Sequence, residues 1–175
     1  MAVLFAQDIH VHYGQAYLEV AGQFDGEMEP CFRGQQNGIC GAAVPDFLFF
    51  ITGLHTGKVG FSINLFEEDP GIDDLWDEIV EVSFLVPRNE ISLVEWGAEN
   101  EYTIPIGPGT YRARYYARDM QAGRDLDTNT TSTVVDTYRL DVWKADKAAD
   151  RVVKQTAEIA AYWHDWAATL VSTGS

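Results

Sequence analysis

Short apolar segments follow one another along the chain from residue 9 to residue 143, and turn-forming residues separate them. In most of these segments apolar and polar residues alternate, as in 58–66 and 110–118. Because successive side chains of a strand point to opposite faces of a sheet, the alternation predicts half-buried strands. The continuous apolar run at 47–51 predicts a strand that is buried on both faces.

The predicted strands are 9–20 with a bend at Gly14, 47–52, 58–66, 76–86, 91–96, 101–106, 110–118 and 134–143. Strands of this length and spacing are typical of an antiparallel β-sandwich. We therefore expect a mainly β fold, with an antiparallel β-sandwich domain over residues 1–147. Residues 22–45, rich in Gly, Asn and Gln, are expected to form a long loop.

The end of the chain has a different periodicity. Apolar residues recur there at steps of three and four, which predicts one C-terminal α-helix over residues 148–175, packed on the sandwich. Asp146 or Asp150 is expected to cap its start, and Gly174 lies past its end. The predicted stripe consists of Val152, Thr156, Ile159, Trp163, Trp166 and Leu170.

The chain is strongly acidic, with 12 Lys and Arg against 27 Asp and Glu among 175 residues. Phosphate binding needs a basic surface, so the balance argues against direct binding of nucleic acid or of an anionic membrane. A basic protein partner or a metal ion stays open. Residues 1–87 hold most of the excess, because Arg33 and Lys58 are the only basic residues there besides 14 acidic ones.

One stretch concentrates these charges, with eight carboxylates in the fifteen residues 67–81 and no Lys or Arg between residues 59 and 87. It is either a solvated loop or a patch that imitates the phosphate backbone and docks on a basic groove of a partner protein. We predict the second, with a partner-binding set of Glu67, Glu68, Asp69, Asp73, Asp74, Asp77, Glu78 and Glu81.

Three arginines lie on one face of the predicted strand 110–118: Arg112, Arg114 and Arg118. They fit either a site for an anionic ligand or internal salt bridges to acids on neighbouring strands. In a chain this acidic, internal salt bridges are favoured.

Catalytic motifs are absent from the sequence: there is no nucleophile elbow, phosphate loop or dinucleotide fingerprint. His10 and His12 could present two metal ligands from one strand face, but no further ligands lie near them in the sequence. We therefore predict no enzyme activity, no catalytic or metal-binding residues and no cofactor. A metal enzyme that uses the two histidines as ligands is an alternative hypothesis.

No targeting signal is evident, and the longest apolar run, five residues, is far too short to cross a membrane. We expect a cytoplasmic protein, in which Cys31 and Cys40 stay reduced. A disulfide between them remains open, because it depends on the compartment.

The order of the segments resembles the competence protein J family, which are small bacterial β-sandwich proteins known as inhibitors of a DNA-entry nuclease. The segments that carry the resemblance are VHYGQ at 11–15, VEVSFLV at 80–86, EISL at 90–93, IPIGPGTYR at 104–112 and DTYRLDVW at 136–143. The chain differs from the short members of that family by its longer acidic loop and by the segment that begins at Ala148.

The resemblance implies a β-sandwich that inhibits a nuclease. Together with the charge, it predicts a non-catalytic inhibitor or immunity-type protein that binds a basic partner, such as a nuclease or toxin. The alternative is a module that binds a small ligand or carbohydrate, because the 22 aromatic residues could provide stacking platforms.

Overall fold

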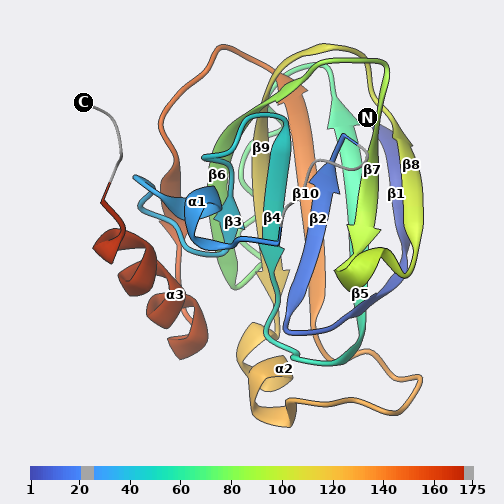
Figure 1. Ribbon diagram of the computed structural model, residues 1–175, viewed down its shortest axis with the longest axis vertical. Helices are drawn as coiled ribbons and strands as arrows, with labels where there is room; N and C mark the ends of the chain where they lie inside the picture. Colours follow the sequence, from blue (N-terminus) through green and yellow to red (C-terminus); the bar gives the residue numbers. More distant parts are fainter. Residues whose placement is uncertain (21–25, 172–175) are drawn as a thin grey trace.

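The computed structural model describes residues 1–20 and 26–171, and it contains two β-sheets with a helix near the C-terminus (Figure 1). The strand order is β1-β5-β10-β9-β6-β11 in one sheet and β3-β4-β2-β7-β8 in the other. In the described residues the strands are β1 (Ala2–Val11), β2 (Gln15–Glu19), β3 (Cys40–Gly41), β4 (Phe47–Ile51), β5 (Gly57–Phe66), β6 (Glu78–Val86), β7 (Glu90–Glu95), β8 (Glu101–Pro105), β9 (Gly109–Arg118), β10 (Thr137–Lys144) and β11 (Arg151–Lys154). The helices are α1 (Glu29–Phe32), η1 (Trp96–Ala98), α2 (Met120–Leu126) and α3 (Glu158–Thr169).

The prediction of a mainly β fold with a C-terminal helix is confirmed, but the prediction of purely antiparallel sheets is wrong. β10 pairs with β5 in parallel, from Thr137 opposite Gly60 to Trp143 opposite Phe66. β10 reaches this position because it also pairs antiparallel with β9 on its other side. The six-stranded sheet is therefore mixed, whereas all pairs of the five-stranded sheet are antiparallel.

The two sheets contribute to one hydrophobic core. All five residues of β4 are buried, as the continuous apolar run predicts. Val59, Phe61 and Ile63 of β5 lie in the core together with Tyr115 of β9, as the alternation predicts. Burying this apolar surface, at about 25 cal/mol per Å², supplies most of the driving force for folding. The division of the chain at residue 147 into a domain and a separate helix stays a prediction.

The predicted helix over 148–175 is wrong in its first part. Residues 151–154 form β11, which pairs antiparallel with the edge of β6. Val152 and Thr156 therefore do not belong to a helical stripe. Asp150 does not cap a helix either, because its carboxylate accepts hydrogen bonds from the backbone N–H groups of Gln36 and Asn37 (2.9 and 2.7 Å). Strand pairing with β6 outweighs the helical periodicity here, since an open sheet edge offers unpaired backbone groups.

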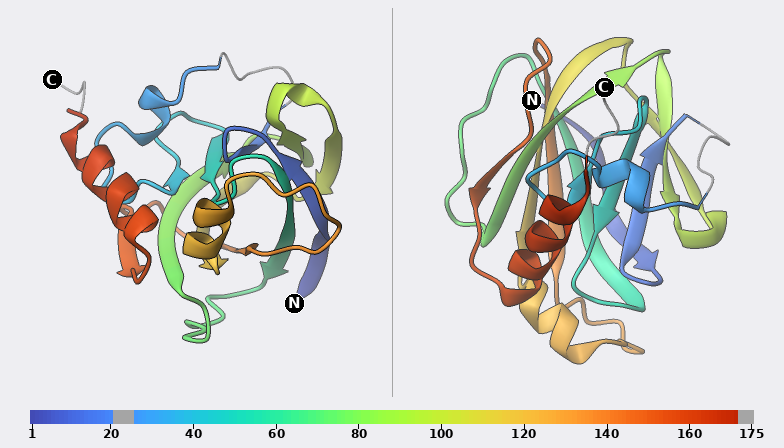
Figure 2. Two further views of the ribbon diagram at one scale, coloured as in Figure 1. Left: turned by 90° about the horizontal axis from the view of Figure 1, so that it is seen from below. Right: turned by 60° about the vertical axis from the view of Figure 1, so that its left-hand side comes forward.

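The helix α3 begins at Glu158 and carries the rest of the predicted stripe. Ile159, Trp163, Trp166 and Leu170 are partly buried and pack against the core. Figure 2 shows α3 lying beside the loop that contains α1. Gly38 in this loop comes so close that a Cβ atom there would lie 1.9 Å from the carbonyl oxygen of Trp163. Gly174, expected past the end of the helix, lies outside the described residues.

Smaller elements also depart from the predictions. Helix α2 lies between the predicted strands 110–118 and 134–143, and β1 begins at Ala2 rather than at Ile9. Cys31 and Cys40 are both buried, and no disulfide joins them in the part of the chain that the structure describes. Within residues 1–20 and 26–171, no helix is long and apolar enough to cross a membrane.

His164 provides a pH-sensitive contact between α3 and the rest of the protein. The backbone N–H of Gly38 donates a hydrogen bond to Nδ1 of His164 (2.9 Å), so the neutral ring carries its proton on Nε2. Burial lowers the pKa of His164 below its ordinary value of 6.5, against the opposing effect of Asp165 and Asp150. The folded protein therefore prefers the neutral ring.

We expect acidification to destabilise this contact. A group whose pKa is lower in the folded state contributes stability that is fully present above about pH 6.5 and is lost as the pH falls below it. A series of thermal melts between pH 7.5 and 5.5 measures the effect. His164→Asn is the control, because its amide oxygen can replace the acceptor and does not titrate. If the variant shows the same slope as the parent protein, another group causes the pH dependence.

Candidate functional site

The acidic segment forms the connection between β5 and β6 and is fixed to the outer face of the six-stranded sheet. Nη1 of Arg114 donates to the carbonyl of Gly71 (2.6 Å), and Arg118 donates to the carbonyl of Leu75 (3.3 Å). On β11, Nζ of Lys154 donates to the carbonyl of Asp74 (2.8 Å). Residues 67–77, which we call the acidic loop, are therefore held by basic side chains from two strands of the sheet.

Carboxylates of the acidic loop make further ion pairs with the same sheet. Arg139 on β10 contacts Asp73 (2.9 Å), and Arg114 contacts Asp69 (3.0 Å). Burial would raise the pKa of Asp73, but the hydrogen bond and the charge of Arg139 lower it below its ordinary value. Asp73 therefore stays ionised and anchored at neutral pH.

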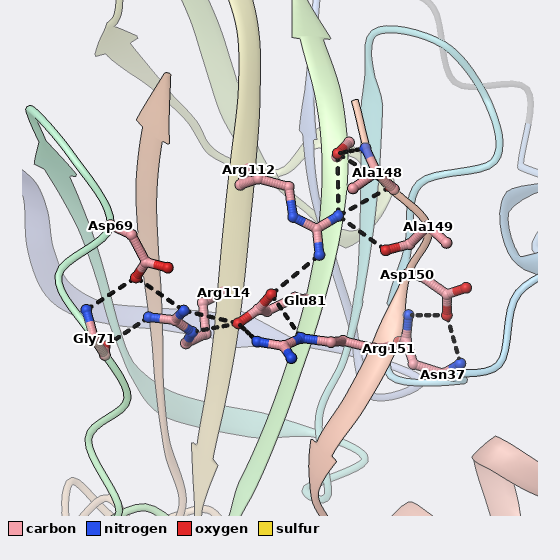
Figure 3. Close-up of polar contacts among 11 residues, drawn as sticks. Asn37, Asp69, Gly71, Glu81, Arg112, Arg114, Ala148, Ala149, Asp150 and Arg151 are labelled. Atoms are coloured by element: carbon pink, nitrogen blue, oxygen red, sulfur yellow. Dashed lines mark hydrogen bonds and ion pairs between the residues drawn. The ribbon is translucent and has the colours of Figure 1, made fainter. Parts of the chain in front are cut away.

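Glu81 on β6 lies at the centre of the buried part of this network (Figure 3). Its carboxylate accepts hydrogen bonds from Arg112 (3.1 Å), Arg114 (2.8 Å) and Arg151 (2.9 Å on each oxygen). Burial alone would raise the pKa of Glu81, but these hydrogen bonds outweigh it and lower the pKa to about 2. One carboxylate thus holds three cations from β9 and β11.

Arg112 extends the network to the segment that precedes β11. Its guanidinium donates to the carbonyls of Ala148 and Ala149 (3.0 and 3.1 Å), as Figure 3 shows. Asp150 continues the connection to Asn37, in the loop beside α3. The network therefore joins the acidic loop, the six-stranded sheet and the C-terminal segment.

Glu78 has a second structural role at the start of α3. It is fully buried, and its carboxylate accepts hydrogen bonds from the backbone N–H groups of Thr156 (2.9 Å) and Ala157 (2.7 Å). Burial raises its pKa, against the opposing effect of these hydrogen bonds. The neighbouring Asp77 accepts a hydrogen bond from the backbone N–H of Asp119 (2.8 Å).

The structure separates the predicted partner-binding set into groups of different exposure. The exposed members are Glu67, Glu68, Asp69 and Asp74, whereas Asp73 and Asp77 are half-buried. Glu78 and Glu81 are buried, which corrects their assignment as residues that a partner can reach. Both belong to the same acidic stretch of sequence as the loop, so composition alone could not distinguish a charge that faces solvent from one that is buried.

The preferred interpretation of the three arginines is confirmed for Arg112 and Arg114, which form internal salt bridges with Glu81. Among the residues that the structure describes, Arg118 has no such salt bridge, and its guanidinium lies over the ring of Trp76 at 4.5 Å. Trp76 packs with Tyr116 and Ile79 in a small second core on this face. Arg114 and Arg118 therefore hold the acidic loop, whereas Arg112 holds the segment that precedes β11.

The two histidines considered as metal ligands have other environments. Nδ1 of His12 lies 2.9 Å from the hydroxyl of Thr56, and its ring packs against Tyr13 and Trp96. The backbone N–H of His10 donates to Glu95. In residues 1–20 and 26–171, no three His, Cys, Asp or Glu side chains are grouped so that they could hold a metal ion.

Sequence reasoning missed three residues that organise this site: Arg139, Asp150 and Arg151. Each pairs with a residue more than 60 positions away in the chain. Arg139 lies on β10, in which apolar and polar residues alternate irregularly, and Arg151 lies on β11, whose sequence fits a helical period. Local patterns therefore did not indicate on which face of the sheet either side chain lies. The surplus of acids in the first half of the chain, with ten of the twelve basic residues in the second half, is the signal that could have suggested such pairing.

Comparisons with known proteins find similarity in structure only. No protein-family model matches the chain, and no curated protein is significantly similar in sequence. The crystal structure of ComJ, inhibitor of the DNA-degrading activity of NucA, from Bacillus subtilis, superimposes with a TM-score of 0.61 at 16% identity, over 82% of this chain and 98% of ComJ.

A second solved structure, of the crocagin biosynthetic gene J protein, gives a TM-score of 0.53 at 13% identity, over 83% of this chain and 100% of the other. The resemblance inferred from the strand and turn segments is thus confirmed for the fold. The chain has a ComJ-like fold.

Proposed function

We propose that this chain is a non-catalytic β-sandwich protein of the cytoplasm that inhibits a nuclease, with the acidic loop as its contact surface for a basic groove of that enzyme. The fold similarity to ComJ supports the class of function. The observation that carries the contact surface is the clamping of an acidic loop by Arg114, Arg139 and Lys154.

Clamping makes the acidic loop suitable for rapid and tight association. A loop that is already ordered does not lose conformational entropy when it binds. The backbone carbonyls of Gly71, Asp74 and Leu75 are used for anchoring, so the loop is held without using the exposed carboxylates of Glu67, Glu68 and Asp74. A row of carboxylates on a fixed loop resembles a phosphate backbone in charge and can compete with nucleic acid for a basic groove.

The proposal predicts that the exposed carboxylates affect binding and not folding. In the triple variant Glu67→Gln, Glu68→Gln, Asp74→Asn we expect an unchanged or slightly higher Tm, because exposed like charges contribute only about 0–1 kcal/mol each. The rate of association with a basic partner should fall by roughly 10-fold or more at low salt, and the difference should shrink at high salt.

The partner is first captured from the native host with the parent protein. The captured protein is then assayed for DNA degradation with and without added inhibitor, and binding kinetics are measured at two ionic strengths. The matched control is Glu90→Gln, Glu99→Gln, Glu101→Gln, which removes the same charge from exposed positions on and near β7 and β8. Equal loss of association in both triple variants would show that total charge matters and that the acidic loop is not the contact. A captured partner without DNA-degrading activity would contradict the proposed class of function.

A further inference from the structure

A cavity of about 360 Å³ lies between α3, α2 and the ends of β2 and β4. Aromatic side chains approach it from two sides: Tyr13 from the turn between β1 and β2, and Tyr162 and Trp163 from α3. Tyr13 and Tyr162 are 54% and 60% exposed, so both rings are available to a ligand. Figure 1 shows α2 and the β1–β2 turn at the lower end of the molecule and α3 on its left side.

The backbone of Tyr13 has a left-handed conformation, which is more common for Gly and Asn than for an aromatic residue. Its φ is +56°, in the left-handed region, where a bulky side chain costs free energy. Its ring contacts those of His55 (5.1 Å) and Trp96 (5.3 Å), which fix its position beside the cavity. An exposed aromatic ring that is kept in a strained turn and supported by other rings points to a binding role.

The charge of the cavity is opposite to that of the protein. Among the described residues that line it, none is Asp or Glu, whereas Arg124 and His55 are basic. Arg124 has a partner, Asp127, but the contact is long (3.7 Å) and both side chains are more than half exposed. Such a pair contributes little, so the guanidinium can turn to an anionic ligand at small cost.

We propose that this cavity binds a small planar aromatic ring that carries a carboxylate or phosphate group. The ring stacks between Tyr13 and Tyr162, and Arg124 pairs with the anionic group. Gly14 and Gly53 also line the cavity, and a Cβ atom at Gly53 would lie 1.9 Å from the carbonyl oxygen of Met120, so this glycine lets α2 lie close to the end of β4. The acidic loop is not involved, so this proposal does not rest on the proposed inhibition of a nuclease.

The test uses two probes that each join an aromatic ring to an anionic group. Indole-3-acetate carries a carboxylate, and adenosine 5′-monophosphate carries a phosphate. Titrations followed by amide NMR are expected to shift the resonances of Gly14 and Gly53 and to saturate. The neutral analogues indole-3-acetamide and adenosine should bind roughly tenfold more weakly, because they lose the charged hydrogen bond. Tighter binding of one of the two anions shows whether the cavity prefers an aromatic carboxylate or a nucleotide phosphate.

Three variants locate the binding. Tyr162→Ala should weaken binding about 2- to 10-fold, and Tyr13→Gly should do the same while keeping the turn, since Gly adopts a positive φ freely. Arg124→Gln should weaken the binding of the anions roughly tenfold and leave the binding of the neutral analogues unchanged. Arg88→Gln is the control for charge, because Arg88 is exposed and does not line the cavity.

Three results would overturn the proposal. The first is the absence of saturable shifts at Gly14 and Gly53 with both anions at millimolar concentration. The second is an equal effect of Arg88→Gln and Arg124→Gln, which would indicate attraction by net charge alone. The third is that a neutral sugar, methyl glucoside, binds in the same cavity more tightly than either anion does.

Discussion

Replacing Glu81 with Gln is expected to lower the free energy of unfolding by about 3–5 kcal/mol, because it removes the buried counter-charge that Arg112 and Arg114 share. The side chains of Arg112 and Arg114 are only 8% and 1% exposed, so water cannot solvate their charges in place of the carboxylate. For a chain of this size, such a loss corresponds to a fall in Tm of roughly 6–20 °C, which a thermal melt measures. Glu67→Gln, on the exposed part of the acidic loop, is the matched control and should change Tm little.

The pH dependence provides a second test of the same group. The pKa of Glu81 in the folded protein is about 2, below its ordinary value of 4.5. Its contribution to stability is therefore fully present above about pH 4.5 and is lost as the pH falls toward 2. The difference in Tm between the parent protein and Glu81→Gln should narrow over this range. A difference that stays constant down to pH 2.5 would mean that the variant loses stability through packing and not through charge.

Replacing Trp163 with Ala is expected to cost about 3 kcal/mol, the lower end of the range for large aromatic residues, because its side chain is only partly buried. Trp163 packs against the core and against Trp166, whose ring centroid is 5.5 Å away. Its removal should loosen α3 from the loop at Gly38 and lower Tm by roughly 6–12 °C.

Tyr162→Ala is the matched control for Trp163→Ala. It removes the neighbouring aromatic ring of the same helix, but this ring is 60% exposed, so we expect a change of no more than about 0.5 kcal/mol. Equal melting temperatures for the parent protein and Trp163→Ala would show that α3 contributes nothing to the stability of the sheets.

Local patterns predicted the strands well where one face of the sheet is buried and the pattern is long. The alternation of β5 and the continuous run of β4 each indicated the correct element, because burial selects apolar residues at those positions. The same reasoning failed at β11, whose four residues are too short a segment to show a period. The parallel pairing of β5 and β10 was also missed, since nothing in the local sequence specifies which distant strand becomes a neighbour.

The candidate site shows a different limit. The eight carboxylates were evident from the sequence, and so were the three arginines of β9, but their pairing was not. Glu81 and Asp74 are both acidic residues of one stretch, yet one is buried among arginines and the other is exposed. Glu81 lies on β6, where arginines of β9 and β11 surround it, whereas Asp74 lies in the acidic loop, and this difference is a property of the tertiary fold.

The position of β11 at the far edge of β6 has a consequence for the synthesis of the protein. A ribosome completes β6 at residue 86, but the strand that covers its edge is not made until residues 151–154. In the interval the nascent chain presents an unpaired edge, and Glu81 acquires its cations one at a time, from Arg112, then Arg114, then Arg151. The six-stranded sheet can therefore be completed only after residues 151–154 have been synthesised. Interrupted synthesis would leave an edge open to pairing with other chains, which is the condition for aggregation or for capture by a chaperone.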